Sequence, residues 1–203
     1  MLRRGVPSLT VSLLVVFMLA VGAPSASAVS LDKVTGGQSA LFVPFSNVQK
    51  LGAKSIFVSP IPPAFLTFNS FQEGPALRFP ISGGLVESDT MVGTVDHAGG
   101  MLMQKINPDG TVAAELEVTV PRILNGNLLT GNALGLVPTP TANLINPTHS
   151  KNDAGVIHYE ADAQVDPLTA TVLNTYFSTD AFEANMILGH LKSDIETEAV
   201  LGL

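Results

Sequence analysis

Strict alternation of apolar and polar residues in two segments constrains the fold of this chain more than any other feature. From 112 to 120 the apolar positions are Val112, Ala114, Leu116, Val118 and Val120. From 156 to 165 they are Ile157, Tyr159, Ala161, Ala163 and Val165. A period of two places successive side chains on opposite faces of a strand. Both segments are therefore predicted to be strands with one buried and one solvated face.

A tight turn is predicted just before the first of these strands. Asn107-Pro108-Asp109-Gly110 separates the segment 101–106 from the segment 111–120. Pro108 fixes φ for the first turn position, Asp109 suits the second, and Gly110 can adopt the positive φ that closes a bulged hairpin. The segment 101–120 is therefore predicted to be a β-hairpin.

Further short apolar runs bounded by Gly, Pro or Asn indicate strands at 55–59, 76–81, 91–97, 127–131 and 187–195. One helix is predicted over 168–177, because Asp166 can cap it and Pro167 suits its first position. Its apolar stripe is Leu168, Val172 and Tyr176, and we expect it to plug one end of the sheet structure. A second short turn is expected at 45–51. The Pro-rich segments 60–63 and 137–147 are predicted to be loops.

These elements predict an all-β fold: an antiparallel β-sandwich or flattened barrel with one or two short helices. Neither an internal repeat nor a domain boundary is apparent, so 29–203 is expected to be a single β-rich domain.

The N-terminus has the pattern of a cleavable signal peptide over residues 1–28. Arg3 and Arg4 precede an apolar run, and Ala26-Ser27-Ala28 supplies the small residues that signal peptidase requires. A membrane anchor is the alternative, but the run is shorter than the roughly 20 residues that cross a bilayer. We predict cleavage after Ala28 and a secreted, extracellular or envelope location, with the general secretory and twin-arginine routes both open.

Charge and cysteine content narrow the classes of partner. The 203 residues carry a net charge of −7, and cleavage of the signal peptide would remove two arginines and no acid. An acidic protein is a poor partner for nucleic acid. The chain has no cysteine, so the expected exported domain is stabilised by packing alone and cannot be a lipoprotein anchored through an N-terminal cysteine. The mature chain has no second apolar run of transmembrane length.

Motifs for catalysis are missing from the sequence: it has no G-x-S-x-G elbow, H-E-x-x-H helix, P-loop or dinucleotide fingerprint. The four histidines, at 97, 149, 158 and 190, lack the spacing that would place two imidazoles on one side of an element. We therefore predict no catalytic residue, no metal and no resident cofactor, although haem is kept as an alternative below.

The candidate ligand-binding residues are His97, Gly99, Gly100, Tyr159 and Tyr176. His97 ends a predicted strand, and the glycines after it would let a ligand approach the backbone, although such glycines more often mark a turn or bulge. Tyr159 and Tyr176 are the only tyrosines. Each lies on an apolar face of its element. A tyrosine there can be a core residue whose hydroxyl finds a partner, or it can contact a ligand. His158 should point away from Tyr159.

Four carboxylates occupy the outward faces of the two alternating strands: Glu115, Glu117, Glu160 and Asp162. They are expected to be solvated. An acidic patch that binds calcium weakly is the alternative, if the two strands lie close together.

Two stretches resemble secreted actinobacterial domains of the haem-transport-associated, HtaA type. In 78–100 a strand, a Gly turn, a short spacer and a strand lead to His97-Ala98-Gly99-Gly100, similar to the His-x-Gly-Gly of that group. In 168–191 the similar positions are Leu173-Asn174, Phe177, Phe182 and Gly189. The resemblance implies a β-rich binding domain. Its haem-carrying members use a tyrosine ligand supported by a histidine, a pair that we do not match to residues here.

Three functions follow as hypotheses. The first is a non-enzymatic, exported binding module for a cell-envelope component. The second is a carrier of haem or another small apolar ligand, which the resemblance implies. The third is a hydrolase with an unfamiliar site that uses Asp96 or His97 together with the acidic strand face.

Overall fold

Eleven antiparallel strands and two helices form the part of the chain that the structure, a computed structural model, describes: residues 31–70, 74–133 and 136–200. The first strands and helix are β1 (Asp32–Phe42), α1 (Phe45–Ala53), β2 (Ile56–Ile61), β3 (Phe65–Ser70), β4 (Gly74–Val86), β5 (Gly93–His97) and β6 (Gly100–Ile106). The remaining elements are β7 (Val112–Leu124), β8 (Leu128–Ala133), β9 (Leu136–Lys151), β10 (Val156–Gln164), α2 (Pro167–Tyr176) and β11 (Ile187–Ala199).

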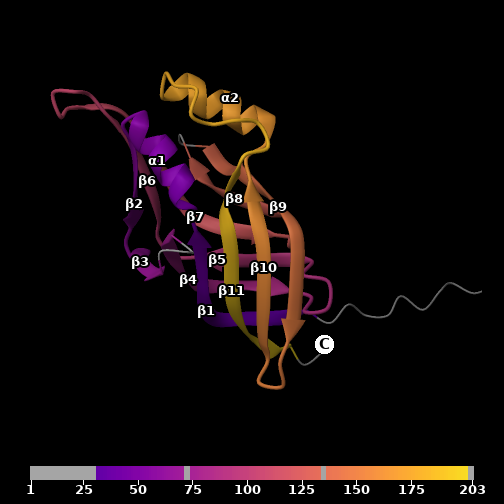
Figure 1. Ribbon diagram of the computed structural model, residues 1–203. Helices are drawn as coiled ribbons and strands as arrows, with labels where there is room; N and C mark the ends of the chain where they lie inside the picture. Colours follow the sequence, from indigo (N-terminus) through magenta and orange to yellow (C-terminus); the bar gives the residue numbers. More distant parts are fainter. Residues whose placement is uncertain (1–30, 71–73, 134–135, 201–203) are drawn as a thin grey trace, which may run out of the picture.

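The sheet closes on itself as a barrel. Its circuit runs β7-β5-β4-β1-β11-β10-β9-β8 and returns to β7 through the β7–β8 pairing. β6 and β2 extend the sheet beyond the circuit from the upper part of β7, and β3 pairs with β4 (Figure 1). The predicted all-β fold with one or two short helices is confirmed, in the closed-barrel form.

The two alternating segments form strands, with two departures in β7. In β10 the predicted inward residues are at most 1% exposed, from Ile157 to Val165. In β7 the pattern holds at Leu116 and Val118 but fails at Val112, which is 50% exposed at the start of the strand, and at Val120, which is 45% exposed and has φ of 48°. The register shifts between Thr119 and Arg122, so Ile123 takes the inward position instead. The predicted inward orientation of Val120 is therefore wrong, because a bulge reverses the faces of β7.

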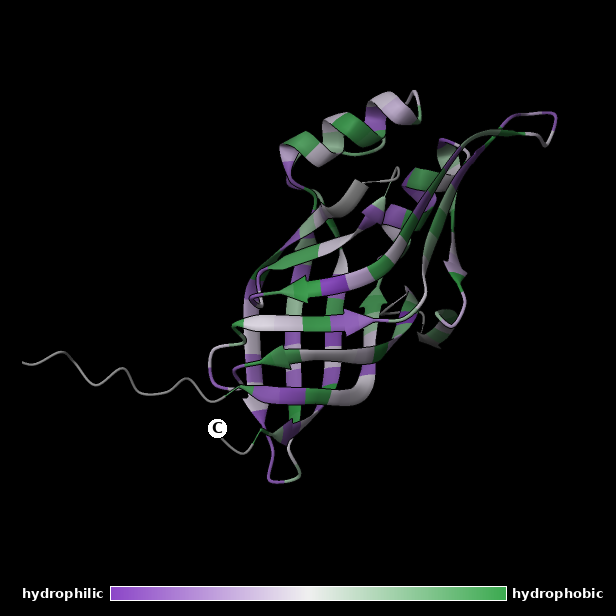
Figure 2. Cartoon of the chain, turned by 180° about the vertical axis from the view of Figure 1, so that it is seen from behind, coloured by the Kyte–Doolittle hydropathy of each residue, from purple (hydrophilic) through white to green (hydrophobic). Residues whose placement is uncertain are grey.

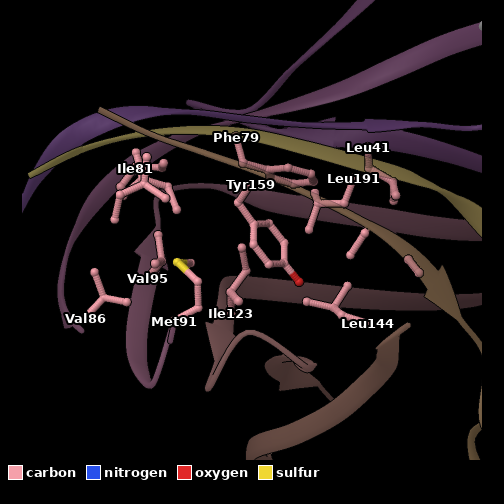
Figure 3. Packing of buried hydrophobic residues seen from close by; sticks show 14 of the residues in the cluster. Leu41, Phe79, Ile81, Val86, Met91, Val95, Ile123, Leu144, Tyr159 and Leu191 are labelled. Atoms are coloured by element: carbon pink, nitrogen blue, oxygen red, sulfur yellow. The ribbon is translucent and has the colours of Figure 1, made fainter. Parts of the chain in front are cut away.

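Apolar side chains fill the barrel interior around Tyr159 (Figure 3). Phe79, Ile123, Leu144 and Leu191 surround its ring, and the hydroxyl donates to the carbonyl oxygen of Gly126 at 2.7 Å. The interior below the helices is thus a packed core.

Both helices lie at one end of the barrel, with α2 across the opening (Figure 1; Figure 2 shows the same end from behind). The carboxylate of Asp166 accepts hydrogen bonds from the amides of Leu168 and Thr169, as the predicted N-cap requires. α1 is a full two-turn helix where a short turn was expected. Within the described ranges, neither helix has the length and hydropathy needed to cross a membrane.

The prediction that 137–147 is a loop is wrong. This segment belongs to β9, which lies between β8 and β10. Pro140 and Pro147 would normally exclude an interior strand, since proline cannot donate to the ladder. Here they lie beside register shifts, next to Thr130 of β8 and between Glu160 and Asp162 of β10. Bulges therefore accommodate the prolines without ending the strand.

Candidate functional site

A cavity of about 810 Å³ lies at the end of the barrel that carries the helices. Its walls come from α1, α2 and the ends of strands that are far apart in the sequence, including β2, β3, β6, β7 and β9. The innermost lining residues, Leu41 and Leu77, belong to the barrel core. The cavity therefore extends from the helices down to the packed interior, and its volume is in the range that holds small-molecule ligands.

The lining is almost entirely hydrocarbon. Met101, Met103, Leu116 and Val118 form the wall from β6 and β7, and α1 and β2 add further apolar side chains, among them Leu51 and Val58. Methionine adapts its shape to irregular contacts, which suits a surface that must fit a ligand. The cavity thus offers burial of apolar surface as its main source of binding free energy.

The apolar stripe of α2 faces this cavity and solvent. Leu168 is 73% exposed and Val172 is 44% exposed, and both line the cavity. The helix is anchored through other residues, Ala170 and Phe177, which are buried. The helix does lie over one end of the barrel as expected, but its predicted stripe is not packed against the core.

Polar contacts hold α2 in place over the opening. The ammonium of Lys105 donates to the carbonyl oxygens of Phe177 (2.6 Å) and Ser178 (2.9 Å), which lie at the C-terminal end of the helix. The hydroxyl of Tyr176 donates to the carbonyl oxygen of Glu115. A cation at a helix C-terminus is favourable because the terminal carbonyls lack helical partners. These bonds fix the helix to the β6–β7 hairpin.

Four of the polar side chains in the lining already have partners. Asn47 donates to the carbonyl oxygens of Ile187 and Leu188, and Thr141 to that of Leu129. Thr169 donates to Asp166, and this hydrogen bond is the main reason why the pKa of Asp166 is lowered. Asp166 is the only charged residue in the lining that the described part of the chain provides.

Two polar side chains in the lining are left without a partner. Asn143 and Thr139, both on β9, line the cavity and are half-buried. Among the described residues, neither side chain has a hydrogen-bond partner. An amide and a hydroxyl are therefore available to a polar group on a ligand.

His97 lies in the barrel wall, away from this cavity, and is 3% exposed. Its Nε2 is 2.7 Å from Ser39 Oγ, and its Nδ1 is 3.0 Å from the carbonyl oxygen of Pro121. Ser39 Oγ is also 2.7 Å from Ser193 Oγ. Burial lowers the pKa of His97 to about 4. Its neighbour Asp96 pairs with Arg122. Asp96 and His97, the residues considered for a hydrolase site, are thus each bonded to other residues of the barrel.

Gly99 and Gly100 make the tight passage from β5 to β6. Gly99 has φ of 83°, and a Cβ there would lie 2.6 Å from the amide nitrogen of Ala64. A Cβ on Gly100 would lie 2.3 Å from the carbonyl oxygen of Val118. Both glycines are therefore explained by close backbone packing, and neither lines the cavity.

The five candidate residues do not converge on one site. Tyr159 is in the barrel core and Tyr176 contacts the β6–β7 hairpin, and neither lines the cavity. Burial raises the pKa of the Tyr159 hydroxyl. His158 and Tyr159 do point to opposite faces, since His158 is exposed and bonded to Asp194 at 2.6 Å. A role for the five residues in ligand binding stays a prediction.

The carboxylates of the alternating strands do not form one patch. Glu115 and Glu117 are on β7, and Glu160 and Asp162 are on β10, which pairs only with β9 and β11. His190 lies between the β10 carboxylates, with Nδ1 2.9 Å from Asp162, which lowers the pKa of that carboxyl. Among the described residues, no group of three or more histidine, aspartate and glutamate side chains could hold a metal ion. The condition for the weak calcium site is thus not met.

Sequence reasoning missed the cavity. Its walls are leucine, valine, phenylalanine and methionine side chains, which have the same pattern as core residues. The one available signal was the apolar stripe of the predicted helix, because such a stripe can contact a ligand as well as the core.

Comparison with known proteins finds similarity in structure only. No protein-family model matches the chain, and no curated protein sequence matches it. The C-terminal domain of HtaA from Corynebacterium glutamicum superposes with a TM-score of 0.58 and 15% identity, over 82% of this chain and 99% of that one. The heme-binding protein HtaB from the same organism superposes with a TM-score of 0.56 and 12% identity, over 84% and 96%. The chain therefore has the fold of the HtaA-type domains.

Proposed function

We propose that this protein is a non-enzymatic, exported binding protein that holds one apolar small molecule in the cavity under α1 and α2. The observation that carries the proposal is the lining itself: about 810 Å³ of space with hydrocarbon walls and a solvent-exposed apolar helix stripe beside it. An exposed apolar surface of this kind is costly in water unless something covers it. The haem-binding relative HtaB supports a binding role over a catalytic one.

Export is part of the proposal and is supported by the sequence pattern alone. Residues 1–28, with the predicted cleavage after Ala28, lie outside the described residues. Export would release this acidic, cysteine-free domain into the envelope or the medium. An apolar molecule there is poorly soluble in water and needs a protein to carry it. An envelope component is the partner proposed to give or take this molecule.

Haem is the ligand suggested by the name of HtaB, but the cavity does not fit it. Haem iron is held by histidine, cysteinate, tyrosinate, or methionine opposite histidine. All four histidines and both tyrosines are among the described residues, and none lines the cavity. Within residues 31–70, 74–133 and 136–200, the thioethers of Met101 and Met103 are the only soft donors in the lining. The same ranges contribute no lysine or arginine to the lining that could pair with the two propionates of a haem.

The direct test uses N-phenyl-1-naphthylamine, an uncharged apolar dye whose emission rises when it leaves water. Titration of residues 29–203 should give a saturable signal with one dye per chain. The variant Leu168→Asp/Val172→Asp should bind about tenfold more weakly or less, because two charges replace apolar lining. Both positions are exposed, so the fold should not change.

The matched control is Thr171→Asp/Thr175→Asp. These threonines are exposed on the same helix and do not line the cavity, and they add the same charge. Equal weakening by the control pair, or an absence of saturable binding by the natural chain, would refute the proposed binding function.

A further inference from the structure

We infer that the cavity selects an uncharged amphiphile, a molecule with a hydrocarbon chain and a neutral hydrogen-bonding group such as a hydroxyl or ester. This inference rests on the proposed function and names the chemical class of its ligand. It is carried by three features of the cavity: the sign of its only charge, the occupied helix N-terminus and the two free polar side chains on β9.

The charges at the cavity disfavour an anionic ligand. Among the described residues that line the cavity, only Asp166 is charged, and it is negative. The nearest lysines on the surrounding elements are occupied elsewhere: Lys54 lies 2.6 Å from Asp180, Lys50 pairs with Glu183, and Lys105 binds the end of α2. Placing a carboxylate in an apolar cavity without a cation is costly. A fatty acid anion or a haem propionate thus lacks a partner.

The N-terminus of α2 is closed to anions as well. Free amides at a helix N-terminus commonly bind phosphate or carboxylate groups. Here the Asp166 carboxylate already accepts from Leu168 N at 2.9 Å and Thr169 N at 3.1 Å. An incoming anion would have to compete with a built-in one.

The two free polar groups favour a neutral head group. The Asn143 amide can both donate and accept, and the Thr139 hydroxyl can do the same. Both lie on β9, and Thr141 between them is already bonded to Leu129. A hydroxyl or ester placed against either side chain would satisfy that group, while the chain of the ligand contacts Met101, Met103 and Leu116.

The experiment measures displacement of bound N-phenyl-1-naphthylamine by three competitors below their aggregation concentrations. Monooleoylglycerol, oleate at about pH 8, where its carboxyl group is ionised, and haemin are compared on the natural chain. Monooleoylglycerol should displace the dye at a concentration at least about tenfold lower than oleate, which has the same chain. Haemin should displace it more weakly than monooleoylglycerol.

Two variants locate the selectivity. Asn143→Val should lower the affinity for monooleoylglycerol about fivefold more than the affinity for the dye, because only monooleoylglycerol loses a hydrogen bond. Val172→Lys should place a cation at the cavity and raise the affinity for oleate about tenfold. Thr171→Lys, which is exposed and outside the lining, should leave the affinity for oleate unchanged.

The outcomes separate this inference from the proposed function. Dye binding followed by equal or stronger displacement by oleate or haemin would overturn the neutral selectivity and leave the binding function standing. Failure of monooleoylglycerol to displace bound dye would do the same. An absence of dye binding would remove the proposed function itself.

Discussion

The imidazole Nε2 of His97 lies 2.7 Å from the hydroxyl oxygen of Ser39, inside the wall of the barrel. A backbone carbonyl only accepts hydrogen bonds, so His97 donates from Nδ1 to Pro121, and Nε2 of the neutral ring accepts from Ser39. Ser39 in turn accepts from Ser193. This network joins β1, β5, β7 and β11, and each of its side-chain polar atoms has a partner. It is consistent with an uncharged His97.

The free energy of unfolding should therefore fall as the pH drops below about 6.5. The folded pKa of His97 is about 4, while an unfolded histidine titrates near pH 6.5, so the unfolded chain binds the proton first. Between pH 7 and pH 5 this group should remove about 2 kcal/mol of stability. Urea unfolding at the two pH values measures the loss.

The control for this pH effect is a second histidine. His97→Gln should reduce the pH-dependent part of the stability, whereas His158→Gln should retain it, because the His158 side chain is 51% exposed. A pH dependence that is the same in His97→Gln as in the natural chain would contradict the assignment to His97.

Tyr159→Phe should destabilise the barrel by about 1 to 2 kcal/mol. The substitution keeps the buried ring but leaves the Gly126 carbonyl oxygen without the hydroxyl that donates to it at 2.7 Å. Dye binding should be unchanged, since Tyr159 lies outside the cavity lining. Loss of binding at full stability would instead place Tyr159 in the ligand site.

Asp166→Ala should weaken both α2 and the cavity. Removal of the N-cap costs about 1 kcal/mol of helix stability, and Leu168 next to it is part of the lining. Helix signal by circular dichroism and dye affinity should fall together. Asp153→Ala, in the exposed turn between β9 and β10, is the matched control and should change neither.

Gly99→Ala should destabilise the protein by at least about 2 kcal/mol more than Gly110→Ala. Both glycines have positive φ, 83° and 86°, so both substitutions strain the backbone. Only at Gly99 would the new Cβ also collide with backbone atoms, 2.6 Å from both Ala64 N and Ile61 O. Equal thermal melting of the two variants would show that the passage between β5 and β6 can relax.

The local structure was predictable where one physical rule acted alone. The alternation in 156–165 identified β10, and Asp166-Pro167 identified the start of α2. β1 was missed because Gly36 and Gly37 interrupt its pattern, and Gly37 permits the approach of Asp194 of β11, whose carbonyl oxygen would lie 2.0 Å from a Cβ. β9 was missed because its prolines are typical of loops, and the bulges that accommodate them become visible only in its pairing with β8 and β10.

The site was less predictable than the fold, for a reason of chemistry. Polar and titratable residues attract attention in a sequence, yet His97 and Tyr159 serve the packing of the barrel. The cavity is made of side chains that look like core residues until the fold leaves space between them. The spacing of Val172 assigns it to the apolar stripe of a helix. Whether that stripe contacts the core or a cavity depends on how distant elements of the chain pack around it.

The packed barrel interior below the cavity also determines how cargo can be exchanged. Tyr159 and the side chains around it fill the space beneath Leu41 and Leu77, so no passage continues through the described core. A molecule that enters at the end bearing α1 and α2 must leave by the same end. Donor and acceptor would then have to meet this one end in turn, and the protein would exchange its cargo as a shuttle and not as a conduit.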